Sequence, residues 1–182
     1  MNFNQAIANS AYKAVHGLLR TPDASGLCLA LVRMIVEDAL FNGQWRFYEW
    51  LTNPVERKPG APGSAFTPVA RDMERSLTRA GMAVPVPTHG RHADPKEAMK
   101  VLRPGDLLFR WDAAAWQWGG GGVEFYGHVG VFLHGALVLE NINPNFRNHS
   151  FKLGVEALTP LHRYPFTTAI RFDPETPPAD PG

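Results

Sequence analysis

The segment at residues 21–38 constrains the fold most, because it predicts a helix that is apolar on nearly every side. It reads TPDASGLCLALVRMIVED, and we expect the helix itself to span about residues 26–41. A helix of this kind has to be covered by other elements, because it has no polar face to turn towards water. The chain must therefore build its core around this segment.

The only cysteine of the protein, Cys28, stands at the start of this expected helix. Ser25 fits the N-cap position, which places Cys28 in the first turn, where unpaired backbone N–H groups and the helix dipole favour an anion. A thiol in that position is biased towards the nucleophilic thiolate. On this segment alone a structural role is the favoured interpretation, because free cysteine usually behaves as a small buried hydrophobe.

The composition indicates a globular protein with no marked preference for a charged partner. Hydrophobic residues make up 45% of the 182 residues, charged residues 19%, and the formal net charge is +1. This balance suits one sizeable core and gives no indication of nucleic acid binding. We see no bilayer-spanning stretch and no secretory signal, so we expect a cytoplasmic protein or one delivered by a non-classical route.

The remaining patterns predict an α+β fold with helices first and antiparallel strands second. Helical spacing and capping signals predict further helices at residues 4–20, 44–52, 69–80 and 95–100. Alternation and turn signals predict strands at residues 107–111, 127–133, 137–143, 151–155 and 167–172. We expect a single domain over residues 1–172 with an insertion at about 42–100, followed by a disordered tail at 173–182.

The β-hairpin expected at residues 127–143 changes how Cys28 is interpreted. A cysteine nucleophile needs a histidine to accept its proton, and that histidine needs a polar partner to fix its tautomer and orientation. The hairpin offers both, because His128 lies on its first strand and several polar groups lie on its return strand. A lone strand histidine is usually structural, but its occurrence with a cysteine at a helix start favours a catalytic pair.

The residue beside His128 depends on the register of this hairpin. A two-residue turn at 134–135 pairs His128 with Asn141 across the strands. A bulged or three-residue turn could bring Glu140 there instead, and a two-residue turn one position later brings Asn143. The sequence leaves these alternatives open.

Three segments together resemble a known group of enzymes. In chain order they read SGLCLALVR, RPGDLLFRW and YGHVGVFLHGALVLENIN. They resemble the three blocks of the NlpC-type and CHAP-type cysteine peptidases and amidases of the papain-like superfamily. In those families the cysteine opens a helix packed on an antiparallel sheet, a Gly-Asp-Leu strand follows, and the histidine comes as Gly-His-Val/Ile-Gly. The resemblance implies a papain-like core with N-terminal helices packed on an antiparallel sheet.

The resemblance also implies roles for individual residues. Cys28 corresponds to the nucleophile and His128 to the general base. The orienting residue falls in the return strand, where an ungapped reading gives Glu140 and the simple hairpin register gives Asn141.

The function implied by the resemblance is hydrolysis of an amide bond, in bacterial cell-wall peptidoglycan peptides or another amide substrate, through an acyl-enzyme on Cys28. We expect no cofactor and no metal, because His89 and His92 have no cysteine or carboxylate cluster near them in the sequence. A non-catalytic binding or virion-structural domain on the same fold, and a thiol acyltransferase, remain alternatives. The sequence does not indicate an oligomeric state.

Overall fold

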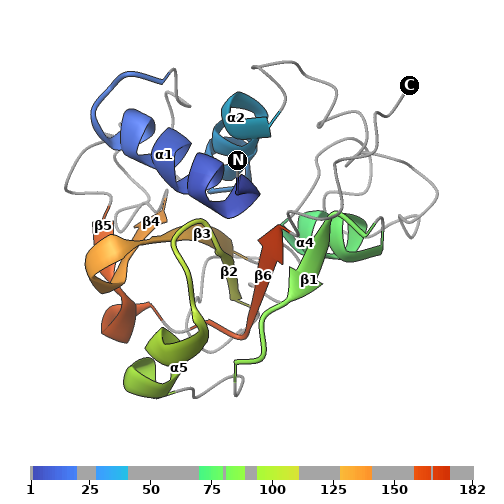
Figure 1. The fold of residues 1–182 in the computed structure, drawn as a ribbon, viewed down its shortest axis with the longest axis vertical. Coiled ribbons are helices and arrows are strands. Elements are labelled where there is room, and N and C mark those ends of the chain that lie inside the picture. The colour runs from blue at the N-terminus through green and yellow to red at the C-terminus, as the bar shows by residue number, and fades with distance from the viewer. Residues whose placement is uncertain are drawn as a thin grey trace, which may run out of the picture.

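The computed structural model describes residues 2–19, 28–40, 70–79, 81–88, 94–110, 128–140, 158–164 and 166–172. Within them lie helices and one six-stranded antiparallel sheet, which confirms the predicted mixture of helix and antiparallel sheet (Figure 1). The helices are α1 (Phe3–Val15), α2 (Cys28–Leu40), α4 (Ala70–Arg79) and α5 (Pro95–Val101), with 3-10 turns η4 (His134–Ala136) and η6 (Leu161–Arg163). The strands are β1 (Ala83–Pro85), β2 (Leu107–Arg110), β3 (His128–Leu133), β4 (Leu137–Glu140), β5 (Leu158–Pro160) and β6 (Thr168–Phe172).

The sheet has the strand order β1-β6-β2-β3-β4-β5, so β3 lies inside it and β1 and β5 lie at its edges. Every neighbouring pair is antiparallel. The two edge strands were not predicted, because three residues are too few to show an alternating pattern. The helix expected at 44–52, the strand expected at 151–155 and the tail at 173–182 lie outside the described residues.

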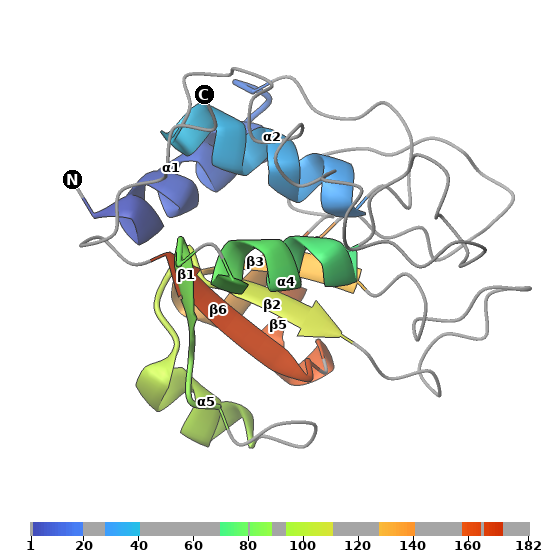
Figure 2. The same cartoon turned by 90° about the vertical axis from the view of Figure 1, so that its right-hand side faces the viewer.

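Helices cover the two faces of the sheet unequally. Figure 2 shows α1 and α2 on one side of the sheet and α5 on the other. Strand β3 follows this division, because Val129, Val131 and Leu133 belong to the cluster of buried residues beneath α1, α2 and α4. By the alternation of a strand, His128 and Phe132 point to the opposite face, where Phe132 packs in a second cluster.

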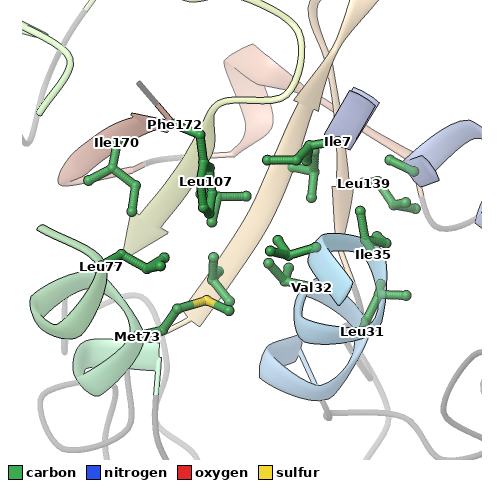
Figure 3. Close-up of a cluster of buried hydrophobic side chains, with 14 of the residues drawn as sticks. Ile7, Leu31, Val32, Ile35, Met73, Leu77, Leu107, Leu139, Ile170 and Phe172 are labelled. Atoms are coloured by element: carbon green, nitrogen blue, oxygen red, sulfur yellow. The ribbon is translucent and has the colours of Figure 1, made fainter. Parts of the chain in front are cut away.

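The larger core surrounds α2, as its apolar sequence predicts. Leu31, Val32 and Ile35 of α2 are fully buried against the sheet (Figure 3). Met73 and Leu77 of α4 pack into the same cluster from the side opposite α2. Burial of each such side chain stabilises the fold by about 1.5–3 kcal/mol. Part of the segment predicted as an insertion is therefore integral to the core.

A buried carboxylate fastens the start of α1 to the sheet. Asp106 is fully buried before β2, and its oxygens accept hydrogen bonds from the Asn4 side chain at 2.5 Å and from the Arg171 guanidinium at 2.9 and 2.8 Å. The backbone N–H of Arg103 supplies a local turn contact at 2.8 Å. Asn4 in turn accepts from the backbone N–H of Phe172 at 3.1 Å. These bonds hold three distant segments of the chain in register.

Candidate active site

Cys28 is the first residue of α2, and its side chain is partly buried. The apolar residues that follow it fix this position, because they anchor α2 over β3 in the larger core. The expected N-cap, Ser25, lies outside the described residues. The cysteine therefore occupies the first turn of a helix that the core holds rigidly against the sheet.

The hairpin between β3 and β4 closes through the three-residue turn η4, at His134–Ala136. Gly135 and Ala136 both have positive φ angles there, 71° and 57°. The resulting register pairs Leu133 with Leu137 and Gly130 with Glu140. The two-residue turn, which would pair His128 with Asn141, is therefore wrong, and the three-residue alternative is found.

This register brings His128 and Glu140 together diagonally. Glu140 pairs with Gly130, two residues along β3 from His128, so both side chains lie on the same face of the sheet. The Nε2 atom of His128 lies 2.7 Å from Oε2 of Glu140. Both residues are buried, with 7% and 3% of their surface exposed. Asn141, the other candidate partner, lies outside the described residues, as does Asn143.

The thiol of Cys28 forms a hydrogen bond with the His128 ring. Cys28 opens α2 and packs against the larger cluster, and His128 is the first residue of β3, so the two residues meet where that strand begins. Because Nε2 of His128 contacts Glu140, Nδ1 is the ring nitrogen left for the thiol. The structure thus connects the cysteine, the histidine and the glutamate in one line.

The electrostatic interactions among Cys28, His128 and Glu140 favour an ion pair between Cys28 and His128. Burial alone raises the pKa of the Cys28 thiol, but the His128 charge, the hydrogen bond to its ring and the backbone N–H groups of Val129 and Leu29 outweigh burial and lower it. Burial likewise opposes a charged His128, yet the Cys28 thiolate and the Glu140 carboxylate raise the pKa of the ring to about 9. Both shifts favour the charged pair, a Cys28 thiolate beside a His128 imidazolium.

Three further residues surround this pair, and sequence patterns did not single them out. The hydroxyl of Thr159 donates to Oε1 of Glu140 at 2.5 Å. The ring of Tyr164 lies with its centroid 5.8 Å from that of His128. Arg110 pairs with His128 across β2 and β3, and its guanidinium lies 5.5 Å from the Tyr164 ring centroid.

Tyr164 is held firmly in this position. It is fully buried, and its hydroxyl donates to the backbone carbonyl of Leu108 at 3.0 Å. Burial and the nearby Glu140 carboxylate raise the pKa of Tyr164 well above its ordinary value, so the hydroxyl remains a donor. No sequence signal links Tyr164 or Thr159 to His128, because only the pairing of β5 with β4 brings their segment to the site.

Two further features concern metal binding and membrane spans. His89 and His92 lie outside the described residues, and the part of the chain that is described contains no group of three metal-binding side chains. None of the helices described here has the length and apolar character needed to cross a membrane.

Comparison of the chain with protein-family models, with curated protein sequences and with solved structures finds no match. What the site can do therefore rests on its own geometry. That geometry is a partly buried cysteine at a helix start, hydrogen-bonded to a buried histidine whose second nitrogen contacts a buried carboxylate.

Proposed function

We propose that the protein is a thiol hydrolase of papain-like fold that cleaves an amide bond. The single observation that carries the proposal is the hydrogen-bonded line from Cys28 through His128 to Glu140. Such a line combines a nucleophile, a base and a residue that orients the base. The placement of Cys28 at the start of a helix packed on an antiparallel sheet supports the papain-like core.

The first half of the reaction uses the ion pair directly. The Cys28 thiolate attacks the amide carbonyl carbon, and the carbonyl oxygen becomes an oxyanion that backbone N–H groups at the start of α2 stabilise. The tetrahedral intermediate then collapses as the carbon–nitrogen bond breaks. The His128 imidazolium gives its proton to the leaving amine, which departs and leaves a thioester on Cys28.

The second half releases the acyl group. Neutral His128 removes a proton from a water molecule as the water attacks the thioester carbon. The carbon–sulfur bond breaks, the acyl group leaves as a carboxylic acid, and the Cys28 thiolate and His128 imidazolium return. Glu140 holds the ring orientation through both halves, because its contact with Nε2 leaves Nδ1 facing the sulfur.

The substrate class that we propose is the peptide of bacterial peptidoglycan. This choice rests on the resemblance of the cysteine and histidine segments to the NlpC-type and CHAP-type enzymes. The chemistry of Cys28, His128 and Glu140 is common to amide hydrolysis and to acyl transfer, so the acceptor, water or an amine, separates the two activities.

Incubation of the protein with purified bacterial cell walls tests the proposal. We expect new amino and carboxyl groups to appear in equal amounts, and Cys28→Ala and His128→Ala to abolish their release with the fold intact. His162→Ala is the matched control, because His162 is an exposed histidine in η6. Undiminished turnover by Cys28→Ala would reject the mechanism, and products joined to an added amine would indicate an acyltransferase.

A further inference from the structure

We propose that Thr159 is a positioning residue of this site, whose hydroxyl holds the Glu140 carboxylate in the orientation that His128 requires. The inference deepens the proposed function and rests on it. It extends the line of contacts by one residue, from Cys28 through His128 and Glu140 to Thr159.

The geometry of the sheet brings Thr159 to Glu140 by the same diagonal offset that brings Glu140 to His128. Thr159 on β5 pairs with Val138 of β4, two residues before Glu140. Its hydroxyl donates to Oε1 at 2.5 Å, while Oε2 lies 2.7 Å from Nε2 of His128. Three side chains on three neighbouring strands therefore form one oblique row across the sheet.

Each carboxylate oxygen of Glu140 thus has a different partner. The terminal torsion of a glutamate side chain is broad and rotates easily, so a single contact with His128 would leave the carboxylate free to turn. The bond from Thr159 fixes the second oxygen and removes that freedom. As a consequence, Oε2 of Glu140 stays directed towards the His128 ring, and this contact keeps Nδ1 of the ring directed towards Cys28.

Thr159 also supports the charge of Glu140. Glu140 is 3% exposed, so hydrogen bonds replace the water contacts that its carboxylate oxygens lose on burial. Among the described residues, His128 and Tyr164 interact with the charge of Glu140, and Arg110 and Cys28 act in turn on the Tyr164 phenol. Without the Thr159 hydroxyl the carboxylate would support the imidazolium, and through it the thiolate, less well.

The segment at 158–164 contacts the catalytic pair at two points. Thr159 bonds the carboxylate, and Tyr164, five residues later, packs its ring against His128. The two contacts differ in kind, because the Tyr164 hydroxyl donates its hydrogen bond to the backbone carbonyl of Leu108 rather than to the pair. Thr159 alone of the two forms a hydrogen bond with Glu140 within the described residues.

The test is the rate at which iodoacetamide alkylates Cys28 as a function of pH, measured on the full chain. Thr159→Val keeps the branched shape and removes the hydroxyl. We expect it to move the midpoint of the alkylation profile upward by on the order of 0.5 to 1 pH unit and to lower turnover of cell-wall substrate by about tenfold. Thr159→Ser keeps the hydroxyl and restores both values.

A control variant and a second pair of variants accompany this test. Thr78→Val removes a threonine hydroxyl that bonds the Glu74 carbonyl in α4, and should leave the profile unchanged. If Thr159→Val does not fold, Thr159→Ser and Thr159→Ala form a second pair, because both lose the methyl group and only serine keeps the hydroxyl. Identical profiles for that pair, or an unshifted profile for a folded Thr159→Val, would overturn the role of Thr159.

The alkylation profile of the wild type separates the positioning role of Thr159 from the thiolate mechanism itself. If wild-type Cys28 titrates as an ordinary thiol near pH ~8.5, the thiolate mechanism itself is rejected. If the wild-type thiol reacts at lower pH and the Thr159 variants leave that behaviour unchanged, only the positioning role is rejected.

Discussion

His128 and Glu140 contact each other diagonally across β3 and β4, with Nε2 of His128 lying 2.7 Å from Oε2 of Glu140. Directly across the two strands, Glu140 lies opposite Gly130, and its carboxylate reaches the histidine two residues away along β3. The diagonal contact exists because the η4 turn has three residues and so sets the register. The turn of the hairpin therefore decides which residue orients the histidine.

Replacement of Glu140 by glutamine tests the importance of this contact. Glu140→Gln keeps a hydrogen-bonding group but removes the negative charge that helps to raise the pKa of His128. We expect the pKa of His128 to fall and hydrolysis to slow by about 10²-fold. Histidine proton resonances followed by NMR during titration, together with product assays, measure both effects. An unchanged His128 titration would contradict the assigned pairing.

Gly130 is expected to tolerate no side chain. A methyl group at Gly130 would lie 2.7 Å from the Val138 side chain, 3.0 Å from the Leu139 carbonyl and 3.2 Å from the Tyr164 hydroxyl. Gly130→Ala should therefore lower the free energy of unfolding by about 1–3 kcal/mol, as overpacking does in cores. Chemical denaturation measures the change, and a variant as stable as the wild type would show that the two strands and Tyr164 are not packed this closely.

Asp106 should contribute to stability rather than to catalysis. Asp106→Asn removes a fully buried charge from the Arg171 guanidinium, and we expect a loss of about 2–4 kcal/mol in the free energy of unfolding. Glu97→Gln is the matched control, since the Glu97–Lys100 ion pair has a similar 2.6 Å separation but is solvent-exposed. Denaturation midpoints compare the two. Equal losses of stability in the two variants would show that the buried Asp106–Arg171 pair stabilises the fold no more than the exposed Glu97–Lys100 pair does.

The elements that could be predicted from the sequence are those with strong local signals. The apolar pattern predicts α2, and Asp94 caps α5 as the Asp-Pro pair indicates. Strands β2, β3 and β4 follow from alternation and turn residues, and each begins at or next to its expected residue. These features depend on neighbours along the chain, which a sequence displays directly.

The supporting residues of the site could not be predicted, because they depend on contacts between distant segments. Thr159 and Tyr164 reach the site only through the pairing of β4 with β5. Asp106 stands at the turn before β2, and its contact with the Arg103 backbone is local. Its contacts with Asn4 and Arg171 join segments near the two ends of the described chain, and no local pattern indicates them.

The pH dependence of Cys28 alkylation by iodoacetamide, compared between wild type and His128→Ala, tests whether His128 activates Cys28. The thiolate forms above the lowered pKa of Cys28, and the imidazolium persists until pH reaches about 9, so the ion pair occupies the window between these values. We predict that wild-type Cys28 reacts well below the ~8.5 of an unperturbed cysteine. In His128→Ala, burial remains while the His128 charge is lost, so the midpoint should move above that value. Coincident profiles near pH ~8.5 for both proteins would contradict activation of Cys28 by His128.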